Sequence, residues 1–90
     1  MSEMVHERAI ALADETGRRF DLVRVHAEEQ PGGTWQGWIE FRSAEGESLA
    51  TERETTQSNR EGVTYWATGL EPVFLEGALQ RATDAKRRRR

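Results

Sequence analysis

The sequence predicts an α+β fold: an antiparallel β-meander of four or five strands with one C-terminal helix packed on one face. Several segments alternate apolar and polar side chains with a period of two, which is typical of strands with one buried face. Short loops rich in glycine and polar residues join them, which favours antiparallel neighbours. After Pro72 the apolar residues change to helical spacing. The 90 residues predict a single domain over residues 1–85 and a basic, disordered tail over residues 86–90.

Residues 1–18 are compatible with two structures. Ser2 followed by alanines and ended by Gly17 is typical of a capped helix. Ile10 and Leu12, which alternate with alanines before the polar residues 14–17, are typical of a strand that turns into the next one. We favour the strand, which gives the sheet its fifth member.

Residues 20–28 and 34–42 are predicted to form an antiparallel hairpin. The intervening residues 29–33 contain Pro31, which presets one backbone angle, and two glycines that permit positive φ. One side of the hairpin is apolar and carries Val23, Val25, Ala27, Trp35, Gly37, Ile39 and Phe41. The other side is mixed and carries Leu22, Arg24, His26, Gln36, Trp38, Glu40 and Arg42.

Two further strands are predicted downstream. Residues 48–56 alternate weakly and are polar enough to lie partly exposed. After the polar loop 57–62, residues 63–68 place Val63, Tyr65 and Ala67 on one face, and Thr64, Trp66 and Thr68 on the other. Together with the hairpin, these strands make a meander.

A helix is predicted from about residue 72 to the tail. Proline is favoured in the first turn of a helix, and Glu71 lies where an acid interacts well with the helix dipole. Gly77, inside this helix, predicts a close approach to the sheet. The apolar stripe is Phe74, Leu75, Ala78, Leu79 and Ala82, and the residues expected beneath it are Val23, Val25, Trp35, Ile39, Phe41, Leu49 and Tyr65.

Charge is divided unevenly along the chain. All 16 acidic residues precede position 86, whereas five of the 13 lysines and arginines are residues 86–90. The remaining eight cations against 16 acids give the body a formal charge of −8, beside +5 on the tail. An acidic body repels phosphate, so nucleic acid is possible as a partner but disfavoured.

Composition and motifs exclude several classes of function. The chain has no cysteine, no apolar stretch of about 18 residues that could cross a membrane, and no secretory signal, so we expect a cytoplasmic protein. His6 and His26 show no ligand spacing. Because no nucleophile, base and orienting group can be assembled, we expect no enzyme, cofactor or metal.

The mixed side of the sheet is the predicted binding site. If the apolar side is covered by the helix, Trp38 and Trp66 face away from it, with Arg24, His26 and Arg42 as neighbours. Tryptophan and arginine are enriched in protein interfaces, so we predict a homodimer or a protein partner on this face. The alternative is a regulator that binds single-stranded nucleic acid through the same rings and the arginine-rich tail.

The order of strands followed by a helix resembles that of the Whirly-like single-stranded DNA-binding regulators. This resemblance, which is of topology, implies a curved four-stranded sheet, a terminal helix and a dimer. No motif of that family matches these residues, and the acidic strands depart from its basic binding face, so no site residue is carried over.

Overall fold

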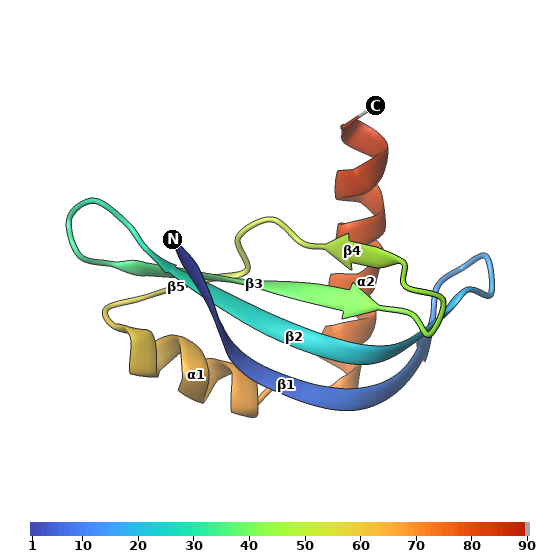
Figure 1. Cartoon of the computed structure of the whole chain (residues 1–90), viewed down its shortest axis with the longest axis horizontal. Helices are drawn as coiled ribbons and strands as arrows, with labels where there is room; N and C mark the ends of the chain where they lie inside the picture. Colours follow the sequence, from blue (N-terminus) through green and yellow to red (C-terminus); the bar gives the residue numbers. More distant parts are fainter. Residues whose placement is uncertain (90) are drawn as a thin grey trace.

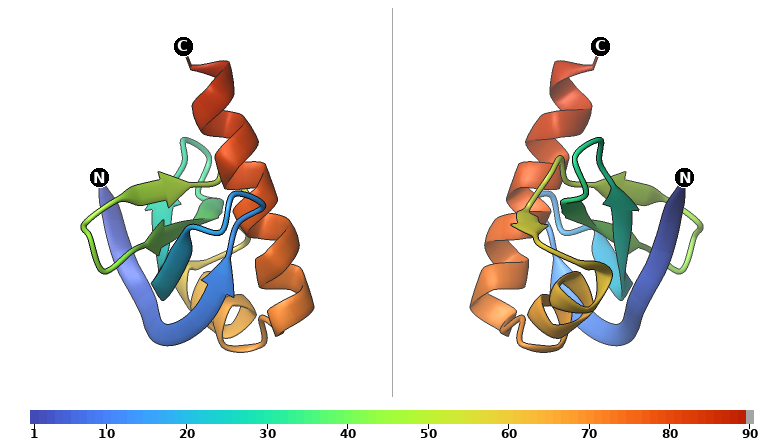
Figure 2. Two further views of the ribbon diagram at one scale, coloured as in Figure 1. Left: turned by 90° about the vertical axis from the view of Figure 1, so that its right-hand side faces the viewer. Right: turned by 90° about the vertical axis from the view of Figure 1, so that its left-hand side faces the viewer.

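The computed structural model describes residues 1–89 and confirms an α+β fold with an antiparallel sheet and a C-terminal helix. Within these residues the sheet has five strands, and two helices cover one of its faces (Figures 1 and 2). The strand order is β1-β2-β3-β4, with β5 also paired to β3. The elements are β1 (Ser2–Ala13), β2 (Arg19–Glu29), β3 (Trp35–Arg42), β4 (Ser48–Ala50), β5 (Thr55–Gln57), α1 (Arg60–Thr68) and α2 (Pro72–Arg88).

The β2–β3 hairpin forms as predicted. His26 lies opposite Trp38 and Val25 opposite Ile39. The connecting turn is closed by a 2.7 Å hydrogen bond from the Gln30 amide to the Thr34 carbonyl. Gly32 and Gly33 both adopt positive φ, 96° and 93°, which explains why two glycines occupy this turn.

The first segment is a strand, as favoured from the sequence. β1 pairs antiparallel with β2, with register shifts between Met4 and His6 and between Ala9 and Leu12. In the turn that follows, the Asp14 carboxylate accepts hydrogen bonds from the amides of Thr16 and Arg18. These hydrogen bonds stabilise the turn and determine where the chain reverses direction.

The segment predicted as one strand over residues 48–56 is divided into β4 and β5, which both pair with β3. The chain leaves the ladder between them, but Thr51 stays attached. Its amide donates to the Ile39 carbonyl at 2.9 Å, and its hydroxyl accepts from the Ile39 amide at 3.0 Å. A side chain therefore replaces a backbone acceptor, and Glu52 and Arg53 are left exposed.

The prediction of a strand over residues 63–68 is wrong, because these residues belong to α1. The Asn59 side chain caps this helix by accepting a 2.8 Å hydrogen bond from the Gly62 amide. Val63 and Ala67, four residues apart, form its buried side. Tyr65, predicted beneath the C-terminal helix, is instead 83% exposed.

The C-terminal helix forms where the sequence predicts it. α2 begins at Pro72 and buries Leu75, Ala78, Leu79, Ala82 and Ala85. It continues to Arg88, so residues 86–88 of the segment expected to be disordered are helical. Arg90, the last residue of that segment, lies outside the described residues.

A close approach of helix to sheet occurs at Gly37 and not, as predicted, at Gly77. A Cβ atom on Gly37 would lie 2.7 Å from Cγ1 of Val63 and 2.9 Å from Cγ2 of Thr55, so only glycine fits without displacement. At Gly77 the nearest atom is a guanidinium nitrogen of Arg81, 3.2 Å away. The core between sheet and helices includes Phe20, Val23, Val25, Ile39, Phe41, Val63 and Leu79.

Over residues 1–89, neither helix combines the length and the apolar composition that crossing a membrane requires.

Candidate interaction surface

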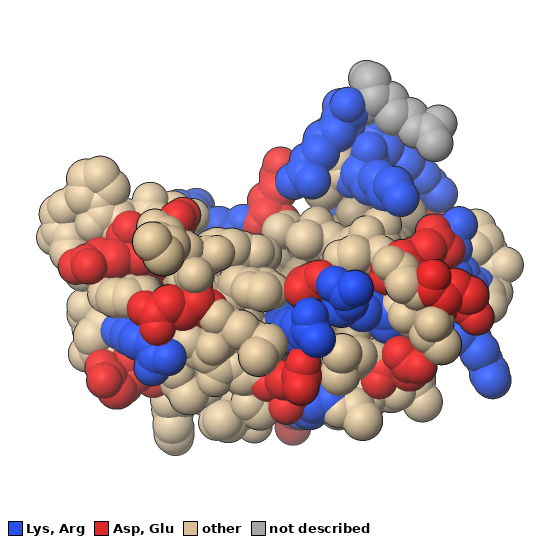
Figure 3. Space-filling model, in the orientation of Figure 1, with Lys and Arg blue, Asp and Glu red and all other residues tan. Residues whose placement is uncertain are grey.

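The sheet face opposite the helices, here called the open face, is formed by side chains that alternate with the buried ones. Figure 1 looks onto this face, and Figure 3 shows acidic and basic groups interspersed over it around uncharged surface. Because Val25 and Ile39 point into the core, their neighbours in sequence point away from it. The open face includes Met4, Glu7, Leu22, Arg24, His26, Glu28, Gln36, Trp38, Glu40 and Arg42.

A row of three side chains crosses the centre of the open face. Met4 lies opposite His26, and His26 lies opposite Trp38, on three adjacent strands. The rings of His26 and Trp38 are stacked, with centroids 5.7 Å apart and planes 20° apart. Met4 is 49% exposed, so a flexible thioether borders the stacked pair.

A polar network centred on Glu40 flanks this row. The Glu40 carboxylate is 2.8 Å from Nε2 of His26, and it accepts hydrogen bonds from Arg42 at 3.0 Å and from the Ser48 hydroxyl at 2.8 Å. Burial alone would raise the pKa of Glu40, but the hydrogen bonds from His26, Ser48 and Arg42 outweigh it and lower the pKa. Glu40 is therefore held ionised in the middle of the face.

Four of the predicted site residues share the open face. His26 and Arg42 contact Glu40, Trp38 stacks on His26, and Arg24 forms a 2.7 Å ion pair with Glu7 of β1. The strand alternation was sufficient to place them together. Each of the two arginines is already engaged by a glutamate, which the sequence alone did not reveal.

The fifth, Trp66, is not on this face, because its segment is helical rather than extended. It packs edge-on against Phe74 of α2, with ring centroids 6.0 Å apart. The two side chains line a shallow hollow of about 310 Å³ between the helices, together with Tyr65, Gly69, Leu70 and Glu71. The sequence signal that could have shown this is Asn59, a capping residue placed before Val63 and Ala67 at helical spacing.

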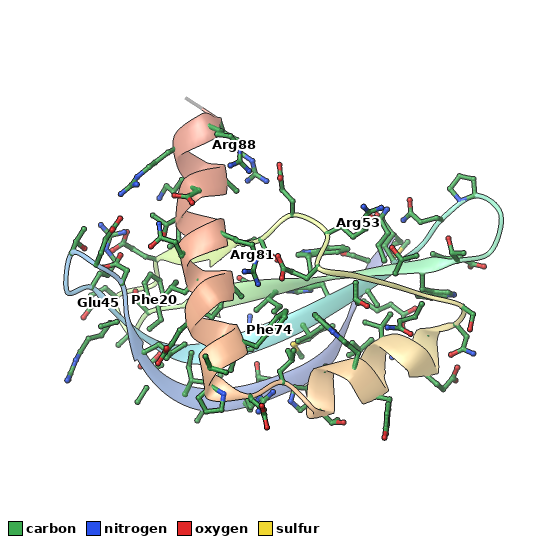
Figure 4. The ribbon with its side chains drawn as sticks, turned by 180° about the vertical axis from the view of Figure 1, so that it is seen from behind. Phe20, Glu45, Arg53, Phe74, Arg81 and Arg88 are labelled. Carbon is green, nitrogen blue, oxygen red and sulfur yellow. The ribbon has the colours of Figure 1, made fainter. Side chains whose placement is uncertain are left out.

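The basic end of α2 projects beyond the sheet and contacts acids of the body (Figure 3). Arg87 lies 3.0 Å from Glu15, and Arg88 lies 3.1 Å from Glu52. Earlier in α2, Arg81 forms two hydrogen bonds with Glu54 and lies 5.2 Å from the centre of the Phe74 ring (Figure 4). The basic segment is thus partly neutralised within the molecule.

The histidines do not meet in one site. His26 belongs to the open face, whereas His6 lies near Arg8 on β1, and burial together with the charge of Arg8 lowers the pKa of His6. Arg8 donates a 2.9 Å hydrogen bond to the Ala67 carbonyl of α1. No group of three side chains suited to a metal ion occurs among residues 1–89.

The open face therefore carries a row of Met4, His26 and Trp38 bordered by charged side chains. Such an arrangement is suited to contact with another macromolecule. No protein-family model, no curated protein and no solved structure matches this chain.

Proposed function

We propose that this protein is a small non-enzymatic interaction module that binds a second copy of itself or a partner protein across the open face. The observation that supports the proposal is the row of Met4, His26 and Trp38, which lies on the face of the sheet opposite both helices (Figures 1 and 2). Methionine, aromatic residues and arginine are the types enriched at protein interfaces. A half-buried tryptophan at the centre of such a patch is typical of a residue that dominates binding energy.

The ion pairs of the open face favour protein over nucleic acid. Arg24 pairs with Glu7, and Arg42 pairs with Glu40. Binding of phosphates needs free cations, because affinity comes from the counterions they displace. A surface that carries both signs of charge can instead match a copy of itself about a two-fold axis.

Sedimentation over a wide range of concentrations tests the proposal. We expect self-association that the substitution Trp38→Ala weakens about thirtyfold or more, which corresponds to a binding hot spot of about 2 kcal/mol. The matched control is Tyr65→Ala, which removes an exposed aromatic ring from the helical side and is expected to leave association unchanged.

Photo-cross-linking in cells tests for a partner protein other than a second copy. A photoreactive residue at Gln36, on the open face, is compared in cells with one at Tyr65. Enriched protein adducts at Gln36 that Trp38→Ala abolishes support the proposal. A protein that is monomeric at every concentration, and that gives equal adducts at both positions, contradicts it.

The stacked rings of His26 and Trp38 support a second candidate function, the binding of single-stranded nucleic acid, because such platforms can stack unpaired bases. A fluorescent oligonucleotide is titrated at low and high salt, with and without residues 86–90. Binding at low salt that depends on Trp38 favours this candidate, whereas no binding at low salt rejects it.

A further inference from the structure

The hollow between α1 and α2 is bordered by three aromatic rings. The planes of Trp66 and Phe74 are 89° apart and their centroids 6.0 Å apart. Tyr65, which is 83% exposed, borders the same hollow. Figure 4 shows Phe74 on the side of α2 that is turned toward α1. Because the face of an aromatic ring attracts cations, rings that border one hollow from two helices can surround a positively charged group.

The Phe74 ring already lies near one cation, which does not fill the hollow. The Arg81 guanidinium is 5.2 Å from the centre of this ring. It is held by two hydrogen bonds to Glu54. Of residues 1–89, those that line the hollow do not include Arg81. The hollow is therefore open to a second cation.

The charged residue of the hollow is acidic. Within the described part of the chain, the lining consists of the three aromatic residues with Gly69, Leu70 and Glu71. Glu71 is the N-cap residue of α2, but its side chain makes no capping hydrogen bond. It also takes part in none of the ion pairs formed within residues 1–89. The carboxylate of Glu71 is therefore available to a ligand.

Two helix ends of opposite sign meet at the hollow. α1 ends beside Gly69, with no basic residue in its last turn, and α2 begins at Pro72. The partial negative charge at the end of one helix offsets the partial positive charge at the start of the other. The carboxylate of Glu71 therefore sets the sign of the local charge, which favours a cation.

We propose that this hollow binds a small molecule that carries a quaternary ammonium group. A primary ammonium has three N–H donors, each of which needs an acceptor, whereas the walls of the hollow are mainly aromatic and aliphatic. A quaternary ammonium has no N–H donor, so its methyl groups can pack on the rings while its charge is attracted to the rings and to Glu71.

The size and the position of the hollow limit this proposal. A volume of about 310 Å³ is at the lower limit of small-molecule sites, which restricts the ligand to an ammonium head and a short chain. The hollow lies between the helices, on the side of the sheet opposite the open face, and the proposal does not depend on what the open face binds.

A titration with choline, followed by NMR through the indole N–H signals of the tryptophans, tests the site. We expect the Trp66 signal to shift. Choline should bind about tenfold more tightly than its neutral isostere, in which a carbon atom replaces the ammonium nitrogen. Trp66→Leu should weaken choline binding about tenfold or more, whereas Trp38→Leu, on the open face, should leave it unchanged.

A charge substitution keeps the test decisive if Trp66→Leu fails to fold. Glu71 is exposed, so Glu71→Gln should not disturb the core. It is expected to weaken choline binding about threefold and to leave binding of the isostere unchanged. The matched control is Glu76→Gln, at another exposed position of α2 outside the hollow, which should change neither affinity.

Equal affinity for choline and the isostere, or a Trp66 signal that choline does not move, overturns the proposal. A peptide with one trimethyl-lysine that binds far more tightly than choline would identify the occupant as a protein side chain and overturn the assignment to a small molecule. Self-association that Trp38→Leu weakens while choline binding persists concerns the open face alone, so the two proposals fail separately.

Discussion

At the scale of single residues, two positions are important for the stability of the fold, Glu40 and Gly37. Glu40 joins three strands by accepting hydrogen bonds from His26 of β2, Arg42 of β3 and Ser48 of β4. At Gly37 of β3, Val63 of α1 packs so close to the backbone that an added Cβ would lie 2.7 Å from it. One position supports the open face, and the other supports the helical layer behind it.

Replacement of Glu40 is expected to change the pH dependence of stability. Its pKa is lower in the folded protein than the usual value of 4.5, so the stability it contributes is present above that value and is lost as the pH falls through the folded-state pKa. Glu40→Gln should lower the free energy of unfolding at neutral pH by about 1–3 kcal/mol and flatten its decline in acid. Urea denaturation over a pH series measures both.

The control for this prediction is Glu29→Gln, at the exposed end of β2. This variant should follow the pH profile of the unmodified protein. If the free energy of unfolding of Glu40→Gln falls in acid as steeply as that of the unmodified protein, the network around Glu40 contributes nothing to stability.

Alanine at Gly37 is expected to destabilise the fold by overpacking. The added Cβ would lie 2.7 Å from Val63, well inside contact distance, and such strain costs about 1–3 kcal/mol. Chemical denaturation of Gly37→Ala, beside Gly69→Ala as control, measures the effect. At Gly69 the nearest atom lies at 3.7 Å and φ is −94°, so alanine there should be tolerated. Equal stability of the two variants would contradict the close approach.

At the scale of elements, the short helix α1 is the part of the fold that local pattern predicts least well. Its residues alternate as a strand would, yet Val63 and Ala67 also lie four apart, as the buried side of a helix requires. The Asn59 cap and the close packing of Val63 against Gly37 favour the helix. As a consequence Trp66 joins Phe74 between the two helices instead of Trp38 on the sheet.

Loss of the cap should destabilise α1. Asn59→Ala removes the acceptor of the Gly62 amide and is expected to cost about 1 kcal/mol. Asp at the same position keeps an acceptor and should retain most of the stability. Thermal unfolding followed by circular dichroism compares the three proteins, and an alanine variant as stable as the asparagine protein would mean that the cap is dispensable.

At the scale of the whole molecule, the basic end of α2 is held against an acidic body. The Arg87–Glu15 and Arg88–Glu52 pairs link α2 to the β1–β2 turn and to the segment between β4 and β5. All four side chains are more than half exposed, and exposed pairs are weak and screened by salt. The body and the helix end are therefore loosely coupled by charge, whereas the apolar stripe of α2 holds the helix on the sheet.

Removal of both arginines tests this coupling. Arg87→Ala with Arg88→Ala should lower the free energy of unfolding by less than about 1 kcal/mol for each pair at low salt, and the difference should shrink as salt is added. Denaturation at two ionic strengths measures it. A large loss that persists in high salt would show that these residues contribute through packing and not through charge.

Local sequence patterns were enough to predict the fold class, the β2–β3 hairpin with its Gly32-Gly33 turn, and the start of α2 at Pro72. They also predicted that Arg24, His26, Trp38 and Arg42 share a face. These features depend on local backbone preferences and on regular alternation, which neighbouring residues encode. Three features became clear only in the folded chain: residues 63–68 are helical, the chain leaves the ladder between Thr51 and Glu54, and Trp66 does not lie on the open face. A segment of six residues fits both the strand period and the helix period, and packing against Gly37, a residue distant in sequence, favours the helix.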